Sequence, residues 1–340
     1  AGAAGRGEAE GEEMTGTGGN GWESFSFGKE DYRDGLNPIS RVACRITLKF
    51  EIPGPESLQL CPTWENPASG FILWHDNKYF LVTAWHCVTG YNSFKKKREV
   101  IDKHGRTPCQ VVIDLTHLGI DDLKPRPLFE EGRPLWLEHP DREAEIADLV
   151  ALPLAGLPAD TPALFKPGFA EPHPDRHFDL PVGEDVFVVG FPRAIGNGAW
   201  PVWKRASLAS EPTQSLTLAR KPDRPLRAVL VDGAFMEGLS GSLAIRKSAF
   251  PAILTEKGLI RPLWNDRDGT PFWYSLVGVY SGRALENGCG KHTSGKEEQG
   301  TDKAKAGQSD EDELAKARLG IVWKAELLLE VLRHGVRGRG

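Results

Sequence analysis

The sequence predicts an all-β protein built from two strand-rich units, with one helix close to the end of the chain. Short segments rich in β-branched and aromatic residues recur from Arg41 onwards, separated by Pro, Gly, Asn and Asp. Strands do not alternate with long helical patterns, as they would in a βαβ fold. These observations favour paired antiparallel barrels, and a single large β-sandwich is the alternative.

The first unit is predicted to span residues 39–165 and to contain five strands. Each expected strand is dominated by aliphatic, β-branched or aromatic residues, and the second and third flank the turn at residues 75–78. The expected strands are residues 41–50, 70–74, 79–84, 109–115 and 148–154.

The second unit is predicted to span residues 166–340, and the connection between the units falls in a stretch with six prolines between residues 155 and 183. The expected strands are residues 185–190, 200–209, 228–231, 242–245, 274–280 and 320–323. A helix is expected over residues 325–334, because Leu327, Leu328, Val331 and Leu332 share one helical face and Gly335 suits a C-terminal stop.

Two stretches are predicted to lie outside the packed units. Residues 1–38 are rich in Gly, Glu, Ser and Thr, which indicates a flexible tail. A GxGxxG match at residues 16–21 follows no strand and opens no helical pattern, so it does not indicate a nucleotide site. Residues 284–318 form a polar, charge-rich insertion that we expect to be mobile. Two interpretations of it stay open: a gate or docking segment for an activating partner, and a solvated loop without a role.

Composition excludes several classes of function. The formal net charge of −5 lacks the basic footprint of a nucleic-acid-binding protein, and no run of about 18 apolar residues could span a membrane. The five cysteines are odd in number and show no CxxC spacing, which favours reduced thiols and a cytoplasmic location. His173 and His177 are spaced like zinc ligands but lack a third ligand nearby, so we expect neither a metal nor a cofactor.

Three short motifs supply the residue types of nucleophilic catalysis. Residues 83–87 (TAWHC) place His86 at the end of an apolar segment, and residues 148–152 (DLVAL) place Asp148 directly before one. Residues 238–242 (GLSGS) place Ser240 close to glycines on both sides. A serine hydroxyl is a weak nucleophile at neutral pH, so a base such as imidazole must remove its proton as it attacks.

With these motifs, about residues 40–335 of the chain resemble the trypsin-like (chymotrypsin-fold) serine peptidases, and above all their bacterial, disulfide-poor branch. The three motifs correspond to the TAAHC, DIAL and GDSGG sequences of that family. The resemblance implies two antiparallel six-stranded barrels, with His86 as general base, Asp148 as the orienting carboxylate and Ser240 as nucleophile. It also implies an oxyanion hole formed by the backbone amides of Gly238 and Ser240.

Other residues compete for these roles. Ser242 is a rival nucleophile, although Ser240 alone has a glycine two residues before it and one directly after. Cys87 offers a thiol, but on a strand its side chain would point away from that of His86, so a buried structural thiol is expected. The alternative carboxylates are Asp114, Asp121, Asp122 and Asp141.

The chain departs from the family at two positions. Leu239 stands where digestive members carry the Asp that pairs with a newly cut N-terminus, so we do not expect activation by that route. Cys87 lacks its usual disulfide partner, because residues 69–71 (SGF) occupy the matching stretch.

The resemblance also implies a pocket for the side chain before the cleaved bond. Its expected lining contains no carboxylate at the floor, so a neutral, apolar or small side chain is expected there. Glu237 and Arg283 lie near the predicted rim and could select charge. The expected lining residues are Ala234, Phe235, Ser281, Gly282 and Gly320.

We therefore predict an intracellular, regulatory serine endopeptidase that hydrolyses peptide bonds of protein substrates through an acyl-enzyme. The alternative is a catalytically silent trypsin-like scaffold that binds peptides or partners. An esterase of the α/β-hydrolase type is disfavoured, because those enzymes order their residues Ser, Asp, His.

Overall fold

The structure is a computed structural model, and it describes part of the chain. The predicted insertion 284–318, the pair His173 and His177, and most of the predicted tail lie outside the described residues. The described residues are 24–27, 36–50, 66–93, 100–101, 106–120, 124–141, 146–167, 169–172, 180–193, 200–218, 221–248, 252–254, 260–262, 273–283 and 319–338.

Six antiparallel strands of the second unit close into a barrel. Their order is β20-β17-β12-β13-β16-β21, and β21 pairs back onto β20. The six-stranded barrel predicted for this half is confirmed, because closure pairs both sides of each of these strands. The strands are β12 (Asp185–Gly190), β13 (Val202–Leu208), β16 (Ala228–Asp232), β17 (Ser242–Ser248), β20 (Trp273–Arg283) and β21 (Leu319–Lys324).

The first unit forms a curved eight-stranded sheet in the order β22-β9-β10-β4-β3-β2-β5-β6. Within the described residues no pairing joins its two ends, so this half is a half-barrel and not the closed six-stranded barrel that was predicted. Its end strands, β6 and β22, have two residues each and present few backbone groups for a closing ladder. The strands are β2 (Ala43–Phe50), β3 (Asn66–His75), β4 (Lys78–Thr83), β5 (Pro108–Asp114), β6 (Arg126–Pro127), β9 (Leu137–Glu138), β10 (Val150–Leu154) and β22 (Val336–Arg337).

Short elements complete the fold. Strand β1 (Ser24–Phe27) pairs antiparallel with β20 and with β11 (Ala170–Pro172) and so extends the sheet of the second unit. This strand corrects our expectation that residues 1–38 are wholly a flexible tail. The other elements are α1 (Pro38–Val42), α2 (Trp85–Thr89), the 3-10 helix η2 (Thr116–Leu118), α4 (Ala325–His334) and the hairpins β7 (Phe129–Glu130) with β8 (Arg133–Pro134), β14 (Leu216–Leu218) with β15 (Lys221–Leu226), and β18 (Ala252–Leu254) with β19 (Ile260–Pro262).

Three apolar cores hold these elements together. One fills the interior of the half-barrel and contains Ile46 and Leu81, and another fills the closed barrel and contains Val188 and Val322. The third is shared between the two units, and Phe71 of β3 is one of its fully buried members. We call this third cluster the shared core. Its side chains come from both units, so their packing fixes how the half-barrel sits against the barrel.

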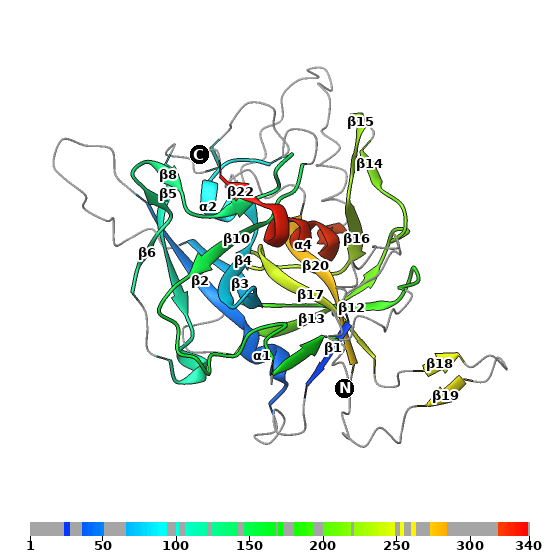
Figure 1. Cartoon of the computed structure of the whole chain (residues 1–340). Helices are drawn as coiled ribbons and strands as arrows, with labels where there is room; N and C mark the ends of the chain where they lie inside the picture. Colours follow the sequence, from blue (N-terminus) through cyan, green and yellow to red (C-terminus); the bar gives the residue numbers. More distant parts are fainter. Residues whose placement is uncertain are drawn as a thin grey trace, which may run out of the picture.

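Helix α4 lies over both units, as the red helix of Figure 1 shows. It contacts β9 and β10 of the half-barrel and β20 and β21 of the barrel, and its leucines enter the shared core. Glu330 on its outer side accepts from His139 (2.9 Å) and from Arg227 (2.6 and 2.8 Å). The Arg227 hydrogen bond holds the pKa of Glu330 below its ordinary value, even though partial burial acts in the opposite direction.

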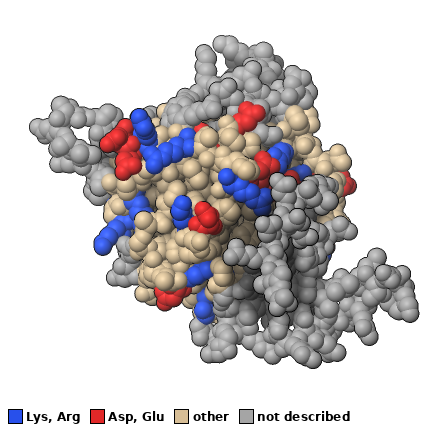
Figure 2. Space-filling view, viewed as in Figure 1, with Lys and Arg blue, Asp and Glu red and all other residues tan. Residues whose placement is uncertain are grey.

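The described surface carries both signs of charge. Figure 2 shows Lys and Arg side chains interspersed with Asp and Glu across the described part of one face. Among the described residues, none of the helices has the length and apolar character needed to cross a membrane.

Gly278 tests how closely β20 and β21 approach in the barrel. Its φ is +155°, and an added Cβ would overlap the carbonyl oxygen of Trp323 on β21. We expect Gly278→Ala to lower the free energy of unfolding by about 3 kcal/mol, the upper end of overpacking costs. The measurement is urea unfolding followed by tryptophan fluorescence.

Gly183→Ala is the matched control, because Gly183 has φ +87° and nothing within 4 Å of an added Cβ. It carries backbone strain alone and should cost about 1 kcal/mol. Equal losses in the two variants would show that the β20–β21 contact in solution is looser than described.

Candidate active site

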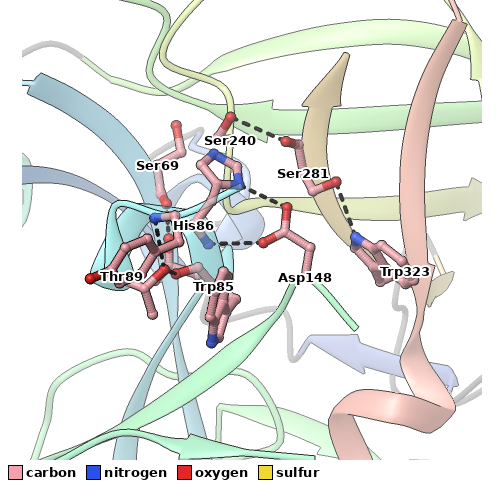
Figure 3. Close-up of polar contacts among 10 residues, drawn as sticks. Ser69, Trp85, His86, Thr89, Asp148, Ser240, Ser281 and Trp323 are labelled. Carbon is pink, nitrogen blue, oxygen red and sulfur yellow. Dashed lines mark hydrogen bonds and ion pairs between the residues drawn. The ribbon is translucent and has the colours of Figure 1, made fainter. Parts of the chain in front are cut away.

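The register between β4 and β10 brings His86 and Asp148 together. Thr83, the last residue of β4, pairs with Val150, the first residue of β10. Asp148 lies two residues before β10 and therefore beside the first turn of α2, which begins at Trp85. One carboxylate oxygen of Asp148 lies 2.7 Å from His86 Nδ1, and the other accepts from the His86 backbone amide at 2.9 Å (Figure 3). Asp148 is 2% exposed, so the carboxylate is held in one orientation.

His86 lies on a helix and not on a strand as predicted. After the extended residue Ala84 the chain forms one turn of helix, which Gly90 ends in the left-handed conformation at φ +72°. The Gly90 amide donates to the His86 carbonyl at 2.9 Å. Cys87 therefore lies on a helix as well, and the prediction that its side chain points away from that of His86 by strand alternation is wrong. Its thiol is nevertheless buried and packs in the core of the half-barrel.

The Asp148 carboxylate controls the charge of the His86 ring. Burial lowers the pKa of His86, but the negative charge of Asp148 and its hydrogen bond to the ring outweigh burial, so the pKa lies well above the ordinary 6.5. The side chain of His86 is 20% exposed, which leaves part of the ring accessible from outside. The hydrogen bond at Nδ1 leaves Nε2 available for proton transfer.

The loop that carries Ser240 is held by its backbone carbonyls. Four consecutive carbonyl groups, those of residues 237–240, each accept a hydrogen bond, so the four peptide planes are fixed in turn. The donors are Arg193 N to Glu237 O (2.7 Å), Ser69 Oγ to Gly238 O (2.7 Å), Ser242 N to Leu239 O (2.9 Å) and Ser69 N to Ser240 O (2.9 Å). Leu239 is 1% exposed and anchors the loop in the core of the closed barrel.

Two amides of this loop have no hydrogen-bond acceptor among the described residues. In a trans peptide the N–H points opposite to the C=O. The carbonyls of Glu237 and Leu239 point to Arg193 and Ser242, so the amides of Gly238 and Ser240 point away from those donors. Gly238 adopts φ +92°, which a glycine allows without strain. Neither amide donates a hydrogen bond within the described part of the chain. Two such amides beside a nucleophile can stabilise a developing oxyanion.

Ser240 completes the group, and the ring of His86 lies between it and Asp148 in Figure 3. Within the described residues its hydroxyl donates to the carbonyl of Ser281 at 3.3 Å, and it makes no hydrogen bond to the His86 ring. The Ser281 hydroxyl in turn accepts from the indole of Trp323 at 3.0 Å. Rotation about χ1 of Ser240 can redirect its hydroxyl, and catalytic hydrogen bonds often tighten only when substrate is bound. The rival Ser242 is fully buried.

The predicted side-chain pocket is filled by aromatic rings of the protein. Phe235 is 4% exposed, and its ring lies 4.6 Å from that of Tyr280, centroid to centroid. A Cβ added to Gly320 would come within 2.5 Å of the Tyr280 ring and 2.8 Å of the Phe235 ring. The space in front of Gly320 is therefore occupied by these two side chains.

The other predicted pocket residues lie in different surroundings. Ser281 and Gly282 lie beside Ser240, since a Cβ on Gly282 would come 2.9 Å from the Ser240 hydroxyl. Ala234 is exposed. Glu237 pairs with Arg193 at 3.2 Å on the surface, and the side chain of Arg283 is outside the described residues.

The carboxylates considered as alternatives to Asp148 either have other partners or lie outside the described residues. Asp114 accepts from the backbone and hydroxyl of Thr116 at the start of η2. Asp141 follows β9, where its amide donates to His139, and Asp121 and Asp122 are not among the described residues. No three His, Cys, Asp or Glu side chains of the described chain cluster closely enough to hold a metal.

Comparisons with known proteins identify similar structures but no family model. No family model and no curated protein matches the chain. The Rv3671c protease of M. tuberculosis in its active form is 14% identical, with a TM-score of 0.41 over 93% of this chain and 91% of that one. The HtrA-type protease AlgW, solved with a decapeptide, is 15% identical, with a TM-score of 0.37 over 87% of this chain and 66% of that one. Both are serine proteases of trypsin-like fold.

The Asp148 carboxylate should set the protonation of the His86 ring. In Asp148→Asn the negative charge is gone while burial remains, so the pKa of His86 should fall from its raised value. NMR titration of the His86 ring protons measures this change.

Asp185→Asn is the control, since Asp185 pairs on the surface with Arg205 at 2.9 Å. It should leave the His86 titration unchanged. An unaltered His86 pKa in Asp148→Asn would mean that the two side chains are not paired in solution.

Proposed function

We propose that this protein is a serine endopeptidase that cleaves peptide bonds of protein substrates through an acyl-enzyme. One arrangement carries the proposal: a His86–Asp148 pair joined by two hydrogen bonds lies beside a loop that carries the Ser240 hydroxyl and two amides without an acceptor among the described residues. A general base, an orienting carboxylate, a nucleophile and oxyanion donors are the groups that acyl transfer needs.

The chemistry assigns each group a step. The Ser240 hydroxyl turns from Ser281 to Nε2 of His86 and attacks the substrate carbonyl while the ring takes its proton. Asp148 holds the ring by Nδ1 and stabilises the imidazolium. The amides of Gly238 and Ser240 bind the oxygen that becomes negative. His86 then gives the proton to the leaving amine, and water, activated by the same ring, hydrolyses the ester on Ser240.

The substrate residue before the cut is proposed to have a small, uncharged side chain. Phe235 and Tyr280 occupy the space in front of Gly320, so a long side chain has no room to enter. The carboxylate of Glu237 is paired with Arg193, which lowers its attraction for a basic substrate residue. The cysteine pattern supports a cytoplasmic location, and the described cysteines Cys44, Cys87 and Cys109 form no disulfide with one another.

A second candidate is a silent scaffold that binds peptides without cutting them. The observation in its favour is the hydrogen bond from Ser240 to the Ser281 carbonyl, which holds the hydroxyl away from the base. The two candidates differ in whether Ser240 ever reacts.

A fluorophosphonate probe tests that reactivity, because it phosphonylates a serine, with loss of fluoride, only when a base and oxyanion donors are in place. We expect covalent labelling of the wild-type protein and none of Ser240→Ala. Ser242→Ala, which removes the buried rival hydroxyl, should still be labelled. Intact-mass measurement gives the readout. A wild-type protein that stays unlabelled, with candidate partners present as well, would favour the silent scaffold.

Removing the Phe235 ring should widen the range of side chains accepted before the cut. In Phe235→Ala the space in front of Gly320 opens, so kcat/KM for peptides with Leu or Phe before the cut should rise at least about tenfold relative to Ala peptides. Cleavage of a peptide series with one varied position measures this ratio, and Phe235→Val serves if the Ala variant does not fold.

Phe129→Ala is the control for the specificity change, because Phe129 packs on Trp136 in the first unit, 5.2 Å between ring centroids. It should leave the preference for small side chains intact. If Phe235→Ala kept the wild-type preference for small side chains, the Phe235 ring would not limit substrate choice.

A further inference from the structure

Ser69 lies where the two units meet at the candidate site. It belongs to β3 of the half-barrel, and its side chain is fully buried. In the sequence, Ser69 stands in the stretch where the family pattern has a cysteine. In the structure each of its polar groups has a partner on a segment of the candidate site or adjoining it.

The Ser69 hydroxyl is used in both directions. It donates to the Gly238 carbonyl at 2.7 Å and accepts from the Phe191 amide at 2.8 Å. Phe191 directly follows β12 and precedes the loop whose Arg193 amide holds Glu237. One hydroxyl therefore ties the Ser240 loop to the chain that leaves β12.

The Ser69 backbone adds two further links. Its amide donates to the Ser240 carbonyl at 2.9 Å, and its carbonyl accepts from the Thr83 hydroxyl at 2.8 Å. Thr83 ends β4 directly before the segment that carries His86. Ser69 thus contacts the chain on both sides of the predicted reaction centre.

These contacts bear on the geometry of Gly238. The peptide before Gly238 is held by Arg193 and the peptide after it by Ser69, so the two hydrogen bonds together determine its φ of +92°. Glycine has no Cβ to restrict φ. Without one of these hydrogen bonds, a peptide next to Gly238 could rotate and move an oxyanion amide out of alignment. The Ser69 hydroxyl is the only side chain among the four donors to the loop carbonyls.

Ser69 also fits its site closely. A Cβ on Gly190 would come 2.7 Å from the Ser69 hydroxyl, so little spare volume surrounds it. Serine supplies a donor and an acceptor on one small atom. Alanine would leave the Gly238 carbonyl and the Phe191 amide without their partner in a buried place.

We propose that Ser69 is a positioning residue that aligns the oxyanion amides, and that it makes their alignment depend on docking of the half-barrel against the barrel. This inference rests on the proposed peptidase function for its catalytic consequence. The effect of Ser69 on order in the loop at residues 236–243 is measured separately from catalysis.

The experiment compares Ser69→Ala with Ser40→Ala in the full chain. Ser40 is the matched control: it is 8% exposed, and its hydroxyl accepts from Trp203 at 2.9 Å, which links α1 to the barrel strand β13. Ser69→Ala loses two hydrogen bonds of a buried serine hydroxyl to the other unit, and Ser40→Ala loses one. Only Ser69→Ala loses one to the nucleophile loop.

Two quantities are measured. Hydrogen exchange by mass spectrometry should show amides at residues 236–243 exchanging at least about tenfold faster in Ser69→Ala and unchanged in Ser40→Ala. Steady-state kinetics should show kcat reduced about ten- to a hundredfold in Ser69→Ala with KM within about threefold, because misaligned amides weaken binding of the transition state and not of the substrate. Ser40→Ala should keep the wild-type kcat.

Each outcome decides one question. Equal exchange at residues 236–243 in the two variants overturns the positioning role, whatever the activity. Faster exchange with an unchanged kcat overturns the catalytic consequence. A wild-type protein that reacts with no fluorophosphonate refutes the proposed peptidase instead, and the exchange comparison still decides the role of Ser69. If Ser69→Ala does not fold, Ser69→Gly, which also removes the hydroxyl and adds no volume, replaces it and should give the same faster exchange at residues 236–243.

Discussion

The shared core is the constraint on which the candidate site depends. Phe71 and Val82 from the half-barrel pack there with Leu243 and Val279 from the barrel and with the leucines of α4. His86 and Asp148 belong to one unit and Ser240 to the other, so no contact within either unit alone sets the distance between base and nucleophile. Close packing of buried apolar side chains resists small sliding movements, and this resistance holds polar groups from distant parts of the chain in register.

Electrostatic contacts reinforce this packing around α4. Glu330 receives hydrogen bonds from His139, which follows β9 of the half-barrel, and from Arg227, which precedes β16 of the barrel. One carboxylate thus joins three elements that are far apart in sequence. Because Glu330 is partly exposed, the energetic contribution of this network is modest beside that of the leucines beneath it. The hydrogen bonds of Glu330 chiefly fix the rotation of α4 about its own axis.

Sequence patterns predicted most of the regular structure. The range predicted for α4 agrees with its observed bounds, as does that of β12, because each carries a clear apolar period and adjacent punctuation by Gly or Pro. The open edge of the half-barrel was missed, because strand periodicity carries no information about which edges meet. Strand β1 was missed because four residues in a Gly-rich context carry too weak a pattern.

The pairing of His86 with Asp148 follows the motif order, but two features of the site depend on packing that motifs do not encode. A helix at His86 replaced the expected strand because Gly90 can close a single turn. Phe235 was predicted to line a pocket, whereas its ring fills that space against Tyr280. Ser69 escaped notice because a serine in an apolar segment has no distinctive spacing, and its four partners come from three separate parts of the chain. The one signal available was that Ser69 lies in the stretch where the family pattern has the disulfide partner of Cys87.

The tight fit around Gly190 has a consequence for how such proteins diverge. A side chain at residue 190 would overlap the Ser242 hydroxyl and crowd that of Ser69, so residue 190 can enlarge only if the side chains of residues 69 and 242 shrink or shift. In an alignment of homologues, substitutions at residues 69, 190 and 242 should appear together, as a correlated set inherited along lineages, and rarely as isolated replacements.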